Sequence, residues 1–288
     1  MLEHFEKDTS GFTDTFDAYI DEALVWLGDN GEFLFDFMRR MLEGMYNSVL
    51  WLLELAPFYV VALVLAVLGW RLVNTWFGAL VGTALVFCAL MGLWPETMST
   101  LALVITATVL ALVVGIPAGV IAGFNPAFDH LLEPVLDLIQ TLPPYIYLLP
   151  AIALLGYGPA TALVATFIVA VPPAFRLTSL GIRMTPREFV ELGEATGITR
   201  WQMFFKIRLP FAMPSILAGI NQSLMMAFGM VVIAGIVGSG GLGETIYGAI
   251  RTLDIAKSID AAIAIVILTM VLDRLTQSAA RVSYGGKQ

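Results

Sequence analysis

The segment Gly238–Gly243, which reads Gly-Ser-Gly-Gly-Leu-Gly, is the first candidate for chemistry because it matches the G-x-G-x-x-G phosphate-binding pattern. Asp260 follows at a distance that would suit a ribose contact. The pattern binds a dinucleotide only between a strand and a helix of a βαβ unit. Here it follows the uncharged apolar run 211–237. We therefore expect a tight outer loop instead of a dinucleotide site.

Other residue types that support catalysis or metal binding occur singly. The sequence has no G-x-x-x-x-G-K-[ST] for ATP and no H-E-x-x-H for zinc. His4 and His130 are isolated, and no nucleophile has a base at a recognisable spacing. The single cysteine, Cys88, lies in an apolar run, which favours a buried hydrophobe over a reactive thiol. We expect a protein that is not an enzyme and that holds no cofactor or metal itself.

The composition indicates a protein that crosses a membrane several times. Of its 288 residues, 58% are hydrophobic and 13% are charged, and the mean hydropathy is +0.84. Soluble domains are about 45–50% apolar and about 25% charged. This balance excludes a nucleic-acid binder, a disulfide scaffold, a disordered chain and an ordinary cytosolic enzyme. The expected fold class is all-α.

Seven apolar stretches are long enough to cross a bilayer core of about 30 Å, which takes roughly 20 helical residues. They are residues 50–69, 74–94, 97–124, 131–155, 159–180, 211–237 and 258–276. Lys and Arg are most frequent in the connection 181–210, which the positive-inside rule places in the cytoplasm. That orientation leaves the N-terminus outside and residues 281–288 as a cytoplasmic tail. Pro117, Pro143 and Pro172 predict kinks.

Residues 1–47 form a separate acidic region. They carry eleven acids and three bases, which accounts for the whole net charge of −8. Apolar residues from Phe12 onward recur every three or four positions, as in an amphipathic helix. A break at Gly28–Gly31 predicts a helical hairpin. Such a hairpin would lie on the outer membrane surface or pack on the membrane-spanning body, and docking of a partner or a regulatory role is the alternative.

Polar side chains inside the apolar stretches are candidates for a translocation path. Gln140 and Thr141 precede Pro143 and Pro144, and Asn221 and Gln222 lie midway through 211–237. Polar residues within a membrane usually face the interior of the helix bundle. The alternative is that they form hydrogen bonds between helices, which contribute about 0.6 kcal/mol each.

The connection 181–210 is too long and too patterned for a simple linker. Thr185 is expected to cap a first helix, and Gly197 to end it in the left-handed conformation. Thr199 is expected to cap a second helix that ends near Ile207. Arg200 and Trp201 would then belong to a cytoplasmic projection that a soluble partner could bind, with an amphipathic linker on the membrane as the alternative.

The same connection resembles the "EAA" loop of ABC importer permeases, E-A-A-x3-G-x9-I-x-L-P. Gly197 and the sequence Ile207-Arg208-Leu209-Pro210 match it, Glu191 stands at its glutamate, and Leu192 and Gly193 replace its two alanines. Further segments resemble the glycine betaine/proline betaine branch of these permeases, and the resemblance covers most of residues 95–280. These segments are Gln202–Lys206, Leu209–Pro214, Ala218–Gln222, Met230–Ile233, Gly240–Gly243 and Leu272–Gln277.

The resemblance implies a type I importer permease in a bacterial inner membrane. Its partners would be a second copy of the chain, a cytosolic ATPase subunit that holds ATP and Mg, and a periplasmic or lipid-anchored substrate-binding protein. Residues 95–280 would be the permease core, and residues 48–94 two accessory transmembrane helices. The loop that couples transport to ATP hydrolysis would include Glu191, Glu194, Ala195, Gly197, Arg200, Trp201, Ile207, Leu209 and Pro210.

The implied solute is glycine betaine or proline betaine. Permeases for choline, carnitine or trimethylamine N-oxide in the same branch would look alike. Two other classes are weaker. A secondary transporter would need ion-coupling residues at the midplane and usually an inverted repeat, neither of which is clear in the sequence. A membrane-embedded enzyme would need paired catalytic residues.

Overall fold

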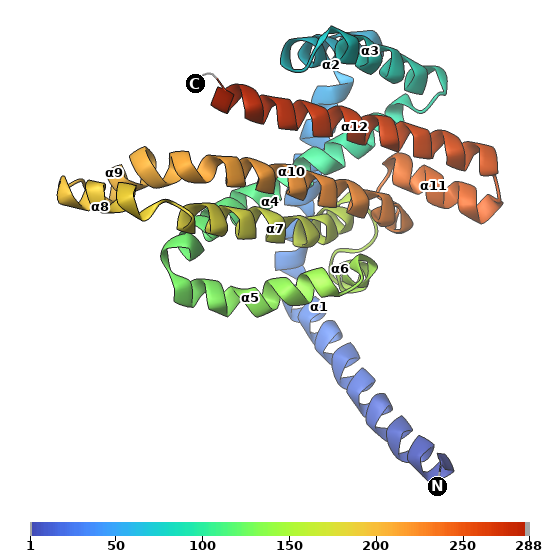
Figure 1. The fold of residues 1–288 in the computed structure, drawn as a ribbon. Coiled ribbons are helices and arrows are strands. Elements are labelled where there is room, and N and C mark those ends of the chain that lie inside the picture. The colour runs from blue at the N-terminus through green and yellow to red at the C-terminus, as the bar shows by residue number, and fades with distance from the viewer. Residues whose placement is uncertain (1, 286–288) are drawn as a thin grey trace.

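Four long apolar helices form the body of the molecule. The computed structural model describes residues 2–285, with side chains for residues 14, 15 and 17–278, and this part of the chain contains helices and connections but no strand. The four helices are long and apolar enough to cross a membrane (Figure 1). They are α4 (Trp94–Phe124), α7 (Pro159–Arg183), α10 (Leu209–Ala234) and α12 (Ile255–Gly285). The expectation of an all-α membrane fold is confirmed.

The remaining three apolar stretches form shorter or bent elements. Residues 74–94 give the 16-residue helix α3 (Thr75–Leu90). Residues 131–155 fall in α5 (Pro126–Thr141), the short 3-10 turn η1 (Pro144–Tyr147) and α6 (Leu148–Leu155), with a bend of 106° at the break. The bend follows the expected effect of Pro143 and Pro144, since neither ring nitrogen can donate a helical hydrogen bond.

The prediction that residues 50–69 form one continuous helix is wrong, although the two helices that replace it are together apolar enough to be a broken span. Helix α1 (Leu2–Glu54) ends within this stretch, and α2 (Phe58–Leu72) starts after Pro57 at an angle of 91° to it. Pro57 has an extended backbone (ψ 151°) at the N-cap of α2, and proline disfavours helical geometry in the residue that precedes it. The chain therefore turns a corner where the sequence shows a continuous apolar run.

The predicted break at Gly28–Gly31 is also wrong, because α1 runs through it as one 53-residue helix. The two glycines lower helix propensity by about 1 kcal/mol each, which weakens a helix without forcing it to end. Asn30 stays within the helix and donates a hydrogen bond from its side chain to the Trp26 carbonyl, 2.8 Å away. Phe12, from which the amphipathic pattern was traced, lies outside the residues whose side chains are described.

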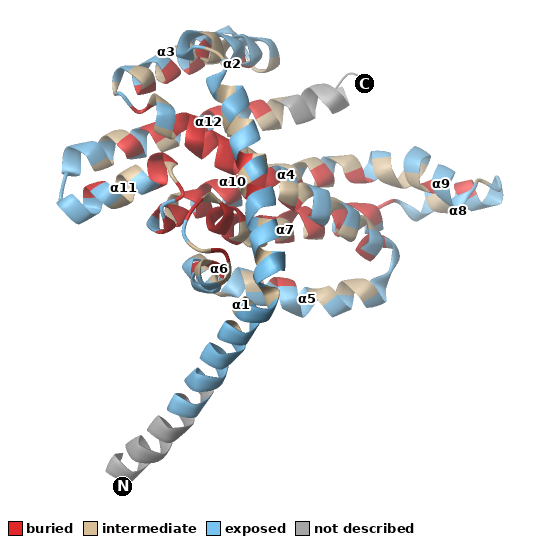
Figure 2. Cartoon of the chain, turned by 180° about the vertical axis from the view of Figure 1, so that it is seen from behind, coloured by how far each residue is buried: buried red, intermediate tan, exposed pale blue. Residues whose placement is uncertain are grey.

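The core lies where α7 packs between α4 and α10 (Figure 2). Gly115, Gly119 and Gly123 repeat every four residues along α4 and lie against α7. A Cβ atom on Gly119 would lie 2.5 Å from the Phe175 carbonyl oxygen, so a side chain there has no room. This close approach of two backbones is how helices associate within a bilayer, where small residues allow extensive packing.

The C-terminal helix extends further than the sequence suggests. α12 continues to Gly285, beyond the apolar stretch 258–276 and into the predicted tail 281–288. Residues 286–288 of that tail lie outside the described residues. Along the bundle, α2 and α3 pack against each other and lie beside α12 (Figure 1).

Candidate coupling and translocation sites

The connection between α7 and α10 projects from one end of the bundle, which we call the coupling end (Figure 1). It consists of α8 (Arg187–Ala195), α9 (Arg200–Met203) and a π-helical turn, η2 (Phe204–Arg208). The two predicted helices are present. The second does not stop near Ile207, because η2 joins α9 to α10 and makes one helical stretch from Arg200 to Val237.

Two of the four predicted helix boundaries in this connection, at Gly197 and Thr199, are confirmed. Gly197 has φ +69° and closes α8 with paired hydrogen bonds, from its own N–H to the Glu194 carbonyl and from Ile198 to Gly193. Thr199 caps α9 together with Gln202 in a reciprocal capping box.

The predicted cap at Thr185 is wrong. Its hydroxyl donates to the Ile182 carbonyl, 3.0 Å away at the end of α7, and Pro186 occupies the N-cap of α8. The hydroxyl thus satisfies one of the unpaired carbonyls that end α7.

Gly193 lies in the interior of the coupling end, where its two helices meet. It is buried, and a Cβ atom there would lie 2.7–3.0 Å from the ends of three side chains, those of Met203, Ile198 and Ile207. Ile207, which the sequence placed in the coupling loop, therefore contributes to the interior of this projection. Replacement of an alanine of the resembled motif by Gly193 is compatible with this packing.

The outer surface of the coupling end is apolar and aromatic. Trp201 is 73% exposed and stacks on Phe205, with ring centroids 5.9 Å apart and an interplanar angle of 14°. Leu192 is also exposed. Several of the predicted coupling residues share this exposure, namely Glu191, Glu194, Ala195, Gly197, Arg200 and Pro210, whereas Leu209 is half-buried. Exposed large apolar side chains beside charges are typical of a surface that binds another protein.

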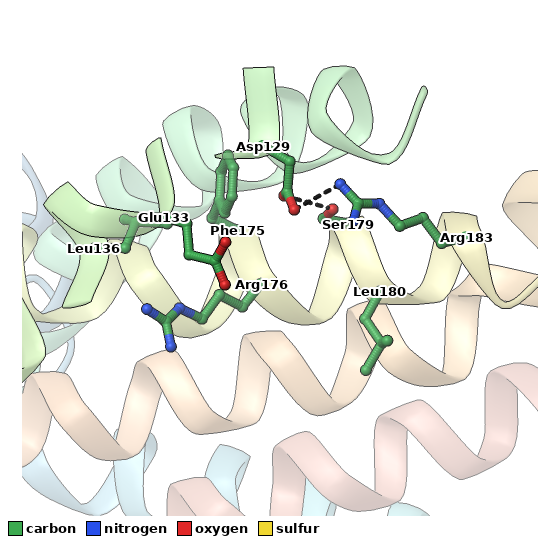
Figure 3. Close-up of a pocket in the computed structure, with 8 residues that line it drawn as sticks. All are labelled: Asp129, Glu133, Leu136, Phe175, Arg176, Ser179, Leu180 and Arg183. Atoms are coloured by element: carbon green, nitrogen blue, oxygen red, sulfur yellow. Dashed lines mark hydrogen bonds and ion pairs between the residues drawn. The ribbon is translucent and has the colours of Figure 1, made fainter. Parts of the chain in front are cut away.

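An ionic cluster that the sequence analysis missed joins α5 to α7 near the coupling end (Figure 3). Arg183 pairs with Asp129 at 2.6 Å and donates to the Ala122 carbonyl at 3.0 Å, while Arg176 pairs with Asp137. Ser179 adds a hydrogen bond of 3.1 Å to Asp129. Asp129, Arg176, Ser179 and Arg183 border a pocket of about 180 Å³. The two ion pairs thus connect α5 and α7, which run antiparallel, at two points along their length.

The predicted polar path residues do not come together in one place. Gln140 and Thr141 are exposed at the end of α5, where the Thr141 hydroxyl donates to the Leu138 carbonyl. Pro143 and Pro144 form the bend itself.

Asn221 faces α12 instead. Its amide donates to Asp273 at 3.1 Å, and Gln277 donates to the same carboxylate at 2.7 Å. This geometry corresponds to the alternative of a hydrogen bond between helices. Gln222, one residue further, is exposed on α10.

The glycine-rich segment lies at the end of the bundle opposite the coupling end. Gly238, Gly240 and Gly241 have φ of +67°, +79° and +78°, which glycine adopts readily, and α11 (Gly241–Thr252) starts there. The Leu242 N–H donates to the Thr100 hydroxyl at 2.8 Å. Within residues 2–285 the segment follows a helix and not a strand, so the βαβ context of a dinucleotide site is missing. Helix α11 was not expected from the sequence.

Comparison with known proteins places this geometry in a family. The family "Binding-protein-dependent transport system inner membrane component" matches residues 115–282. The chain is 37% identical over 265 residues to the glycine betaine/proline betaine transport system permease protein ProW of Escherichia coli K12, covering 92% of this chain and 75% of that protein. It is also 37% identical to the glycine betaine transport system permease protein OpuAB of Bacillus subtilis 168, covering 92% of this chain and 93% of that protein.

A solved structure shares the fold. An inward-facing structure of the MetNI methionine ABC transporter aligns with a TM-score of 0.59 at 22% identity, over 66% of this chain and 95% of that chain.

The chain belongs to the family of binding-protein-dependent transport system inner membrane components. It is a transport permease that crosses the inner membrane several times.

Proposed function

We propose that this chain is the transmembrane permease subunit of an importer that receives its solute from a separate binding protein. Separate cytosolic ATPase subunits, which hold ATP and Mg, would drive it, and a second copy of the chain would complete the pathway. The observation that carries this proposal is the coupling end, where an EAA-like loop folds into a packed projection with an exposed Trp201–Phe205 stack. Membership of the importer family supports it.

The coupling end is the docking site for the ATPase in this proposal. Glu191 and Arg200 supply exposed charges, and Leu192, Trp201 and Phe205 supply apolar surface that water leaves on binding. Gly197 gives the tight turn between the two helices, and Gly193 lies in their buried interface. The projection therefore moves as a unit when the ATPase moves.

The proposed orientation of the chain in the membrane follows from the charges at the coupling end. The coupling end, together with the last turn of α7, carries five of the 15 Lys and Arg side chains of the chain, and the positive-inside rule places such a basic segment in the cytoplasm. These side chains are Arg183, Arg187, Arg200, Lys206 and Arg208. The glycine-rich segment and the crossing part of α1 then lie on the outer side.

Glycine betaine or proline betaine is the proposed solute. The names of ProW and OpuAB both include glycine betaine, and that of ProW also includes proline betaine. Glycine betaine is named as well in the glycine betaine/carnitine transport permease protein GbuB of Listeria monocytogenes, which is 38% identical over 254 residues. Trimethylamine N-oxide permease TmoV of Ruegeria pomeroyi is 36% identical over 222 residues. Carnitine and trimethylamine N-oxide are therefore the alternative solutes, and choline remains a further one from the sequence resemblance alone.

The test starts from the tagged full chain, purified in mild detergent from its own host. Mass spectrometry of the co-purifying proteins is expected to find an ATPase with a P-loop in near-stoichiometric amount. The complex is then reconstituted with its binding protein, and uptake of radiolabelled glycine betaine is measured with ATP. Absence of any ATPase in several detergents, together with uptake that does not need ATP, would favour a secondary transporter.

Two variants test the coupling loop within that assay. Glu191→Lys and Gly197→Val are expected to abolish uptake while the protein stays in the membrane, since one reverses an exposed charge and the other strains a turn at φ +69°. Gly44→Val is the matched control because nothing lies within 4 Å of a Cβ atom there. Normal uptake in both loop variants would show that the loop does not couple the two subunits.

A further inference from the structure

Helix α1 runs across the membrane-spanning helices instead of along them. The axes of α1 and α2 meet at 91°, and α2 packs beside α12, one of the helices long and apolar enough to span a bilayer. Figures 1 and 2 show α1 crossing the bundle of α4, α7 and α10 and continuing beyond it with its N-terminal half. If these helices cross the bilayer, α1 runs parallel to its plane.

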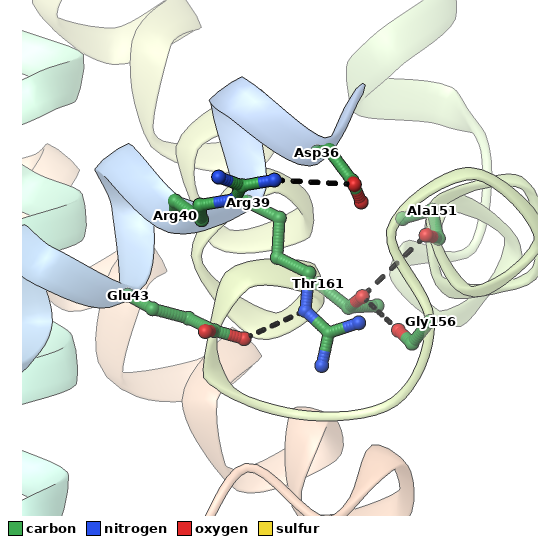
Figure 4. Close-up of polar contacts among 7 residues, drawn as sticks. All are labelled: Asp36, Arg39, Arg40, Glu43, Ala151, Gly156 and Thr161. Carbon is green, nitrogen blue, oxygen red and sulfur yellow. Dashed lines mark hydrogen bonds and ion pairs between the residues drawn. The ribbon is translucent and has the colours of Figure 1, made fainter. Parts of the chain in front are cut away.

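The contacts of α1 with the body fix the level at which it crosses. The Tyr46 hydroxyl lies 2.8 Å from the Ser99 hydroxyl, near the start of α4. The Arg39 guanidinium lies against Gly156, in the turn between α6 and α7 (Figure 4). Both contacts are at the end of the bundle opposite the coupling end. The crossing level is therefore that of one membrane surface and not of the bilayer centre.

One face of α1 is acidic. This face includes the side of the helix that contacts the turn between α6 and α7. Arg39 pairs with Glu43 at 2.9 Å and Arg40 with Asp36 at 3.5 Å (Figure 4). Glu32 and Asp29 follow towards the N-terminus at steps of three or four residues, so they share this face. Because the face lies on the side of the α6–α7 turn, it points away from the bilayer.

The opposite face of α1 is apolar and uncovered. Leu27, Leu34 and Met41 recur every seven residues and are 42%, 56% and 44% exposed, and Phe37 is 58% exposed. Leu34 and Asp36 are about 200° apart around the helix, at about 100° per residue. The apolar face therefore points towards the bilayer, where the spanning helices are surrounded by acyl chains.

We propose that residues 17–41 of α1 lie in the outer water–lipid interface, with the apolar face in the acyl chains and the acidic face in water. A lipid surface is the occupant that fits, because the helix is parallel to the bilayer, its height matches one membrane surface, and its apolar face is directed inward. This stretch is about 37 Å long at 1.5 Å per residue, so it extends the footprint of the chain in that leaflet. The name of the leaflet rests on the orientation proposed above.

Site-directed spin labelling of the full chain in proteoliposomes tests the proposal. Cys88 is fully buried in α3, so Cys88→Ala gives a cysteine-free background for single cysteines. Leu27→Cys and Leu34→Cys report on the apolar face, and Glu32→Cys and Asp36→Cys are their matched controls on the acidic face. Collisions with oxygen, which concentrates in lipid, are compared with collisions with a water-soluble nickel chelate.

The ratio of oxygen to nickel collisions is expected to be several-fold higher at Leu27 and Leu34 than at the two acidic positions. High nickel access on both faces would mean that the helix projects into water and would overturn the proposal. Low access to both reagents at the apolar positions would mean that a protein covers them, and spin–spin broadening would identify a second copy of the chain. The measurement does not use transport, so it can fail while the proposed function stands.

Discussion

Replacement of Gly119 by alanine tests whether the contact between α4 and α7 depends on the absence of a side chain. A Cβ atom at this position would lie 2.5 Å from the Phe175 carbonyl oxygen and 2.8 Å from the Thr178 Cβ. Neither atom is the far end of a flexible side chain, so the two helices must separate. Such overpacking costs about 1–3 kcal/mol, and alanine returns at most about 1 kcal/mol through its higher helix propensity.

The expected net loss is about 1–2 kcal/mol, which corresponds to a fall of roughly 2–8 °C in the unfolding temperature for a chain of this size. The assay is thermal unfolding of the purified protein in detergent, followed by size-exclusion chromatography.

Gly44→Ala and Gly193→Ala are the matched controls, since both glycines also lie inside helices. Nothing lies within 4 Å of a Cβ atom on Gly44, and at Gly193 the neighbours are the mobile ends of Met203, Ile198 and Ile207. Both controls are expected to leave the unfolding temperature unchanged or slightly raised. A Gly119→Ala protein as stable as these controls would refute the argument that the backbones of α4 and α7 are in direct contact.

Three further predictions concern the coupling end. Trp201→Ala is expected to lower uptake at least about tenfold, because aromatic residues often dominate binding energy. Its control is Trp76→Ala, on the exposed face of α3, which is expected to leave uptake unchanged. Equal uptake in the two variants would contradict the proposed docking site. Asp129→Asn leaves Arg183 without its ion pair and is expected to lower the free energy of unfolding by about 1 kcal/mol, since the pair is only partly shielded from solvent. The reversed pair, Asp129→Arg with Arg183→Asp, is expected to recover part of this loss of stability. No recovery would mean that the two charges do not interact. Thr199→Ala removes the capping box of α9 and is expected to speed limited proteolysis between α8 and α9, because a cap contributes about 1 kcal/mol to helix stability. An unchanged cleavage rate would show that the cap does not stabilise this turn.

The sequence predicts the apolar helices well because burial in lipid imposes a simple rule on length and composition. It predicts corners poorly, since a corner depends on competition between local geometry and packing. Pro57 and Pro143 both interrupt apolar runs and both follow a polar residue three positions earlier, but only the second has a proline neighbour that marks the break. Gly28 and Gly31 suggest a helix break in the sequence, but α1 continues through them. Low helix propensity at two positions does not end a helix when the flanking residues favour it.

At the coupling end, the turn residues could be predicted from the sequence, whereas the contacts between helices could not. Gly197 and Thr199 act through their own backbone, so their roles follow from the local sequence. The ion pairs between α5 and α7 involve residues 39 and 54 positions apart. The signal was present, as acids on one face of α5 and two arginines seven residues apart on α7. It becomes a prediction only once the two helices are known to be antiparallel neighbours.

The helix that starts at Arg200 and ends at Val237 is unbroken, although it passes through a π-helical turn and Pro214. At 1.5 Å per residue it is about 57 Å long, which exceeds the thickness of a bilayer core. It rests against α7 along its middle. If the helix turns about this contact as one body, a displacement of Trp201 at one end moves the glycine-rich end in the opposite direction. One continuous helical stretch thus connects the coupling end to the glycine-rich end of the bundle.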